Sequence, residues 1–215
     1  MNSTERDISY QISNTYSTLN ELTSSTKNVW FVCHGMGYLS KYFIRYFKGL
    51  NPEENYIVAP QAQSKYYITP KFKHIGASWL TRENTEMETG NIMSFFDSIF
   101  ERENLIGDKN LIILGYSQGV SVAMRYVAKR HIQCSQLVLH SGGIPKELKK
   151  EAFEFFKGKA KLIYGVNDEY LTDERMTEER HKAETLFGDR LEVTSFEGVH
   201  EVNMNIIEHL IKDKE

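Results

Sequence analysis

The stretch Leu111-Ile112-Ile113-Leu114-Gly115-Tyr116-Ser117-Gln118-Gly119-Val120 joins an apolar run to a helical pattern through the motif Gly-x-Ser-x-Gly. The apolar run predicts a buried strand, and the residues after Ser117 place apolar side chains at helical spacing. A serine at such a junction lies on a strained strand-to-helix turn that exposes its hydroxyl, and small residues at Gly115 and Gly119 let neighbouring backbone approach. Ser117 is therefore a candidate nucleophile.

Residues suited to activate this serine follow later in the chain. The run 160–165 predicts a short buried strand that ends just before Asp168, and the run 191–196 alternates like a half-buried strand that ends just before His200. Hydrolases built on this kind of turn place an acid after a later strand and a histidine after the last one. The order predicts a triad of Ser117, Asp168 and His200, with Glu169 and Asp173 as alternatives for the acid.

These three residue types support nucleophilic catalysis as a unit. A serine hydroxyl is a poor nucleophile until an imidazole takes its proton, and the carboxylate holds the tautomer of that imidazole.

Two competing nucleophiles fit other roles better. Cys33 lies within an apolar strand, where a buried inert thiol is expected, and Ser141 precedes Gly142-Gly143, where a tight turn would line the site.

An oxyanion hole is predicted at the end of an early strand. The run 29–33 is apolar and leads into the glycine-flanked segment His34-Gly35-Met36-Gly37. The backbone N–H groups of Met36 and Gln118 could both point at a developing oxyanion, and each such donor contributes about 3 kcal/mol to transition-state stabilisation. His34 is expected to orient this loop by hydrogen bonding.

Apolar runs alternate with helical patterns along the chain. Strands are predicted at 29–33, 56–59, 111–116, 137–141, 161–165 and 191–196, and a helix is predicted at 86–104. This order indicates an α/β fold with a mostly parallel central sheet flanked by helices. Weak alternation before residue 28 predicts an antiparallel edge hairpin, and residues 61–80 lack a regular period and predict a long loop.

The motifs together resemble the phospholipase/carboxylesterase family of α/β-hydrolases, which includes bacterial carboxylesterases and acyl-protein thioesterases. The likeness covers most of the chain from about Val29 onward. It is carried by His34-Gly35-Met36-Gly37, Ala59-Pro60 with the later Trp79, Gly115 to Gly119, Leu139-His140-Ser141-Gly142-Gly143, the segment 165–168 and His200. The resemblance implies an α/β-hydrolase fold with little or no cap domain. It also implies Ser117, Asp168 and His200 as the triad and the Met36 and Gln118 amides as the oxyanion hole.

Substrate contacts are expected at three further residues. The resemblance makes the 61–80 loop a wall of an acyl groove with Trp79 as its main contact, although Trp79 is equally suited to plug the sheet. Tyr38 stands where many family members have an acidic or small polar residue, so the leaving-group side is expected to differ. Ser141 is expected to line the site. The aromatic residues near 66–79 suit either a groove or a homodimer contact.

Composition and motifs exclude several other classes of function. The chain has 215 residues, 40% of them hydrophobic, which suits a single domain over 1–215 with a sizeable core. A net charge of −3 with mixed signs gives no reason to expect nucleic acid as a partner. The sequence shows no signal peptide or membrane anchor, and with Cys33 and Cys134 read as reduced thiols it predicts a cytoplasmic protein. No metal, dinucleotide or phosphate-loop motif occurs, so no cofactor is expected.

The sequence thus predicts a serine esterase or thioesterase that acts on small to medium acyl groups through an acyl-enzyme. The alternative is a noncatalytic ligand-binding protein on the same scaffold, because fold and motif do not prove turnover.

Overall fold

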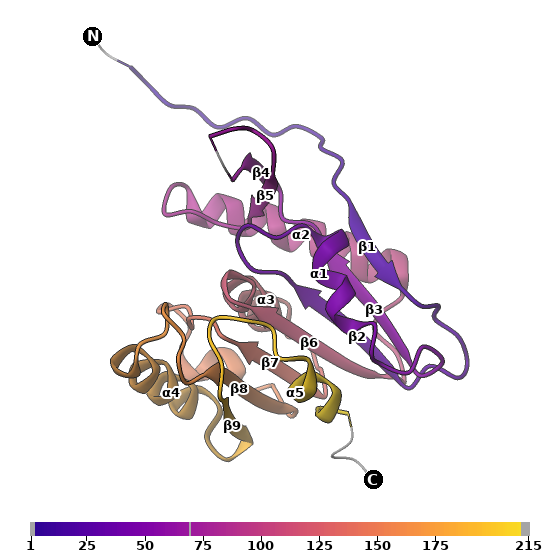
Figure 1. Ribbon diagram of the computed structural model, residues 1–215. Helices are drawn as coiled ribbons and strands as arrows, with labels where there is room; N and C mark the ends of the chain where they lie inside the picture. Colours follow the sequence, from indigo (N-terminus) through magenta and orange to yellow (C-terminus); the bar gives the residue numbers. More distant parts are fainter. Residues whose placement is uncertain (1–2, 69, 212–215) are drawn as a thin grey trace.

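A seven-stranded sheet forms the centre of the computed structural model, which describes residues 3–68 and 70–211 (Figure 1). The strand order is β1-β3-β2-β6-β7-β8-β9. All neighbouring pairs are parallel except β1 with β3, which is antiparallel. The strands are β1 (Tyr16–Leu19), β2 (Asn28–Cys33), β3 (Asn55–Pro60), β6 (Asn110–Tyr116), β7 (Gln136–His140), β8 (Lys159–Gly165) and β9 (Leu191–Phe196).

Helices cover both faces of this sheet. They are α1 (Ser40–Phe43), α2 (Thr85–Glu103), α3 (Gln118–Arg130), α4 (Asp173–Phe187) and α5 (Met204–His209), with 3₁₀ helices η1 (Ile44–Phe47), η2 (Lys150–Phe153) and η3 (Gly188–Arg190). Side chains of α2, α3 and α4 belong to one buried cluster, whereas those of α1, η1 and α5 belong to another. The sheet therefore separates two apolar cores.

Strand β2 shows how the sequence fills both cores. Every residue of β2 is buried, and successive side chains point to opposite faces of a sheet. Phe31 accordingly packs with α2 and α3, whereas Trp30 packs with η1. A strand buried on both faces reads as a continuous apolar run, which is the reason that the sequence pattern identifies it.

The strand order reverses between β2 and β6. After β2 the chain passes outward to β3, and it returns to the other side of β2 as β6. Ligands of open α/β sheets bind at the carboxyl ends of the strands near such a switch point. The loops after β2, β6, β7, β8 and β9 all leave the sheet at this edge.

The predicted fold class is confirmed, and each strand predicted in the main sheet ends within two residues of its observed bounds. The predicted N-terminal edge hairpin is wrong. Residues 3–15 form no strand, and Ile8, Tyr10 and Ile12 are exposed. Within residues 3–27, only β1 joins the sheet, where it pairs with β3, and the alternation of residues 8–12 does not reflect a buried face.

The predicted 61–80 loop is also wrong in part. It contains an antiparallel pair of short strands, β4 (Ser64–Tyr67) and β5 (Ile75–Ser78), with Ser64 opposite Ser78 and Tyr67 opposite Ile75. The pair lies outside the main sheet. Every residue of β4 is exposed, so no alternation of burial marks it in the sequence.

Candidate active site

Ser117 lies between β6 and α3 in a strained backbone conformation, with φ 53° and ψ −119°. The two flanking glycines make this turn possible. A Cβ atom at Gly119 would lie 2.1 Å from the carbonyl oxygen of Cys33, and one at Gly115 would lie 2.4 Å from the backbone nitrogen of Val120. Both sites exclude any side chain, so the turn presents the Ser117 hydroxyl at the carboxyl edge of the sheet.

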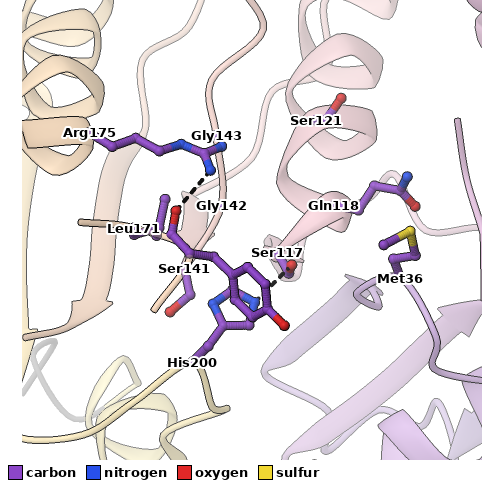
Figure 2. Close-up of a pocket in the computed structure, with 11 residues that line it drawn as sticks. Met36, Ser117, Gln118, Ser121, Ser141, Gly142, Gly143, Leu171, Arg175 and His200 are labelled. Carbon is purple, nitrogen blue, oxygen red and sulfur yellow. Dashed lines mark hydrogen bonds between the residues drawn. The ribbon is translucent and has the colours of Figure 1, made fainter. Parts of the chain in front are cut away.

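His200 bridges Ser117 and Asp168. Its Nε2 lies 3.0 Å from Ser117 Oγ, and its Nδ1 lies 2.7 Å from Asp168 Oδ2. Because a carboxylate only accepts, Nδ1 carries the ring proton and Nε2 is free to accept the serine proton. The three side chains predicted as a triad thus form one continuous chain of hydrogen bonds (Figure 2 shows the Ser117–His200 part).

Asp168 is held in place by the turn that follows it. Its Oδ1 accepts hydrogen bonds from the N–H groups of Tyr170 (2.8 Å) and Leu171 (3.0 Å). The side chain is fully buried. Glu169 and Asp173 are exposed, and Asp168 is the carboxylate that reaches His200.

The segment predicted as the oxyanion hole lies beside Ser117. Met36 and Gln118 both line the pocket that contains the serine hydroxyl. Within residues 3–68 and 70–211, neither backbone N–H has a recorded intramolecular acceptor. The structure thus places both residues of the predicted oxyanion hole at the pocket that contains Ser117.

His34 fixes the loop that carries Met36. The Ala62 N–H donates to His34 Nε2 (3.1 Å), so the ring proton sits on Nδ1, which donates to the Gly35 carbonyl (2.7 Å). Burial lowers the pKa of His34 to about 4, which keeps the ring neutral. The Gly37 N–H donates to the Ala77 carbonyl (2.8 Å), so the β4–β5 hairpin braces the same loop.

Trp79 does not line the pocket. Its side chain is 1% exposed, packs edge-on against Phe96 of α2, and donates from Nε1 to the carbonyl of His34 (2.7 Å). The expectation that it contacts substrate is therefore wrong, and its ring packs in the core between the sheet and α2 instead. Sequence pattern could not decide between the two roles, because both need a large aromatic ring at the end of an irregular segment.

Tyr38 is likewise not among the residues that line the pocket. Its ring packs edge-on against Phe43 and Tyr116, and its hydroxyl lies 3.4 Å from that of Tyr46. It thus belongs to the packing behind the site, and the structure does not place it as a substrate contact. Ser141, by contrast, lines the pocket.

His140 supports this region from beneath. The Asn203 N–H donates to His140 Nε2 (3.1 Å), so its Nδ1 proton points to Ser141 Oγ at 3.0 Å. Burial, aided by the nearby His200, lowers the pKa of His140 to about 3. Both ring nitrogens of His140 are thus engaged with Ser141 and Asn203, and His200 is the imidazole that reaches the serine.

The side chain of Gln118 has a role that the sequence pattern did not reveal. Its Oε1 accepts from the Trp79 N–H (2.8 Å), and its Nε2 donates to the Leu80 carbonyl (2.7 Å). The residue after the serine thus ties the helix start to the segment that follows β5. No local signal in the sequence links positions 39 residues apart.

The site opens into a cavity of about 440 Å³. Its lining, most of which is labelled in Figure 2, consists of Met36, Ser117, Gln118, Ser121, Ser141, Gly142, Gly143, Tyr170, Leu171, Arg175 and His200. Cys33 and Cys134 lie outside it as free buried thiols, and burial raises the pKa of both. Within the described parts of the chain, no cluster of three or more His, Cys, Asp or Glu side chains has the geometry to hold a metal ion. None of the described helices is long and apolar enough to cross a membrane.

Comparison with solved structures gives the same architecture. The chain is similar to esterase PE8 (19% identity, TM-score 0.72, 94% of this chain and 99% of that one). It is also similar to acyl-protein thioesterase 2 of Zea mays (14% identity, TM-score 0.69, 94% and 99%) and to the carboxylesterase of Bacillus cereus (16% identity, TM-score 0.65, 93% and 92%). At these identities the likeness shows the fold. A comparison with curated protein sequences gives no match.

The sequence profile of the Phospholipase/Carboxylesterase family matches residues 14–213, which is nearly the whole chain. The chain belongs to the phospholipase/carboxylesterase family of α/β-hydrolases.

Proposed function

We propose that this protein is a serine hydrolase that cleaves carboxylic esters or thioesters of small to medium acyl groups through an acyl-enzyme. The observation that carries the proposal is the unbroken hydrogen-bond chain from Ser117 through His200 to Asp168, beside the N–H groups of Met36 and Gln118. Family membership supports the reaction class. Turnover of esters and thioesters with different acyl chains determines the acyl length and the choice between oxygen and sulfur esters.

The chemistry follows from the positions of the protons. Ser117 Oγ bonds to the acyl carbon as its proton passes to His200 Nε2, and the Met36 and Gln118 N–H groups receive the negative carbonyl oxygen. The bond to the leaving alcohol or thiol then breaks, and His200 returns its proton to that group. Water, deprotonated by His200, attacks the acyl carbon, and the acid leaves as Ser117 regains its proton.

The test is labelling by a fluorophosphonate, read by intact mass and peptide mapping. We expect one adduct on Ser117, because this reagent reacts with an activated serine. Ser117→Ala should lose the adduct and at least about 10³-fold in ester turnover. Ser98→Ala, an exposed serine on α2, is the matched control and should label like the unmodified protein.

A protein without an adduct, under conditions that label a known serine hydrolase, would contradict the proposal. Binding of an intact ester without turnover would then identify the noncatalytic alternative.

The two free thiols fit the reducing cytoplasm, which we propose as the location of the protein.

A further inference from the structure

The wall of the pocket away from the oxyanion donors carries a single fixed charge. Arg175 lies in the first turn of α4, and Figure 2 shows its side chain extending over the loop 141–143, on the opposite side of Ser117 from Met36 and Gln118. Of the eleven residues described as lining the cavity, it is the one whose side chain is charged at every physiological pH. Asp168 is fully buried behind His200 and does not line it.

One hydrogen bond and the space left by a glycine position the guanidinium at the site. Its Nη1 donates to the carbonyl of Tyr170 (2.9 Å). A Cβ atom at Gly143 would lie 3.1 Å from Nη2, so the glycine leaves the space that the guanidinium occupies. The turn that anchors Arg175 is the one whose N–H groups hold Asp168. The same turn therefore contacts both the guanidinium and the candidate catalytic acid.

The salt bridges of the described residues do not include Arg175. Within residues 3–68 and 70–211, Arg175 forms no ion pair, whereas Arg125, Arg130 and Arg180 each pair with a carboxylate. The buried carboxylate of Glu179, which lies near the guanidinium at Gly143, already has partners, because it accepts from the Ile144 N–H (2.7 Å) and from Lys182 Nζ (2.9 Å). Most of the five N–H groups of the Arg175 guanidinium remain available for an external acceptor.

The other lining residues give no continuous apolar wall for a long acyl chain. The cavity measures about 440 Å³, and the large apolar groups among its described lining residues are Met36, Leu171 and the ring of Tyr170. Long acyl chains need a continuous apolar wall to leave water. Serine hydroxyls and glycine backbone instead surround the approach to Ser117.

We infer that Arg175 binds an anionic end of the substrate, so that the preferred esters are short ones that carry a carboxylate or phosphate besides the ester group. The inference rests on the proposed hydrolase function and specifies its substrate class. A guanidinium forms charge-assisted, often bidentate, hydrogen bonds with such oxyanions. Because Arg175 is exposed, we expect a preference of about 10- to 100-fold in kcat/KM, reduced by salt.

Two matched ester pairs test the inference and locate the anion. Mono-4-nitrophenyl adipate against 4-nitrophenyl hexanoate places the carboxylate on the acyl side at equal chain length. 4-Acetoxybenzoate against its methyl ester places it on the leaving group. For each pair the readout is the ratio of kcat/KM for the anionic ester to that for the neutral one, so any general loss of activity cancels.

Arg175→Met should lower the ratio about 10- to 100-fold for one of the pairs. The pair that responds shows whether Arg175 binds an anion on the acyl group or on the leaving group. Arg175→Lys, which keeps the charge but loses the planar fork, should retain part of the preference. Arg180→Met removes an exposed arginine of the same helix that pairs with Glu184. As a matched control it should leave both ratios unchanged.

Ratios that are equal in the unmodified protein and in Arg175→Met, with both esters of each pair still cleaved, would overturn the inference and leave the hydrolase function intact. Absence of turnover for all four esters together with absence of a Ser117 adduct would overturn the proposed function itself, and the inference with it.

Discussion

The two oxygens of the Asp168 side chain have different partners, and this difference gives the carboxylate a fixed orientation. Oδ1 faces the backbone N–H groups of Tyr170 and Leu171, whereas Oδ2 faces the Nδ1 of His200. Because two N–H groups already bond Oδ1, the orientation of the carboxylate is fixed and Oδ2 determines the tautomer of the His200 imidazole. The chemistry of Ser117 therefore depends on an orientation set by a backbone turn.

Asp168→Asn should reduce kcat by about 10⁴-fold with little change in fold. The Asn oxygen will occupy the Oδ1 position, because two N–H groups point there, and its NH₂ group will face His200 Nδ1. Nδ1 must then accept, so the proton moves to Nε2, which can no longer take the proton of Ser117. Steady-state kinetics of a 4-nitrophenyl ester measures the loss.

Glu169→Gln is the matched control, since it makes the same change in an exposed neighbour. It should keep nearly full activity. Equal activity of Asp168→Asn and the unmodified protein would show that the carboxylate does not set the tautomer.

Gly119→Ala should destabilise the protein by about 1–3 kcal/mol or more, because the added Cβ would lie 2.1 Å from the Cys33 carbonyl oxygen. Gly90→Ala on α2 is the control, since a Cβ there meets no atom within 4 Å. That change should stabilise by about 0.5–1 kcal/mol. Urea unfolding of both variants gives the free energies, and a similar value for the two would show that the turn tolerates a side chain.

Some site residues could be predicted one by one, and others could not. Ser117, Asp168 and His200 each follow a strand, and the structure brings them within hydrogen-bond distance. Arg175 lies in a strongly charged helix, so nothing in its neighbourhood marks it. Its position at the pocket depends on the contact with Gly143, 32 residues away, which no local pattern encodes.

At the level of elements, burial decides which parts of the fold the sequence reveals. Strands β2, β6 and β7 are buried on both faces and read as continuous apolar runs. The β4–β5 hairpin could not be predicted from its own sequence, because hydrogen bonds from distant parts of the chain stabilise it. Gly37 donates to Ala77, and the side chain of Gln118 bonds the backbone of residues 79 and 80.

Gln118→Ala should loosen the end of this hairpin while keeping the backbone N–H of residue 118. Without Oε1 the Trp79 N–H loses its acceptor, so we expect faster amide exchange in the segment 76–80. Hydrogen–deuterium exchange with mass spectrometry measures the rate. Gln63→Ala, at a residue beside the hairpin with no side-chain hydrogen bond recorded in the described structure, should leave exchange unchanged, and equal exchange in both variants would contradict the role of Gln118.

At the level of the whole molecule, two buried neutral histidines connect stability to pH. The pKa of His34 falls to about 4 and that of His140 to about 3, both chiefly because of burial. An unfolded histidine has a pKa near 6.5. Between these values the unfolded chain binds more protons than the folded one, so stability is full above about pH 6.5 and is lost as the pH falls through this window.

His140→Gln should flatten this dependence. Each histidine contributes at most about 1.4 kcal/mol per pH unit to the slope, and Gln can still accept from the Asn203 N–H. Urea unfolding at several pH values from 4.5 to 7 gives the slope for the variant and for His181→Gln, an exposed control on α4. An unchanged slope in His140→Gln would show that this histidine takes up its proton without unfolding.

Strand β9 stands at the edge of the sheet, where it pairs only with β8, and its side chains are exposed or half-buried. An edge strand has a hydrogen-bonded neighbour on one side only, and local opening of part of a structure costs less free energy than global unfolding. His200 follows this strand, so brief detachment of β9 would move the proposed general base away from Ser117 while the remaining strands stay paired. We therefore expect heat to switch off turnover reversibly, several degrees before circular dichroism records any loss of helix.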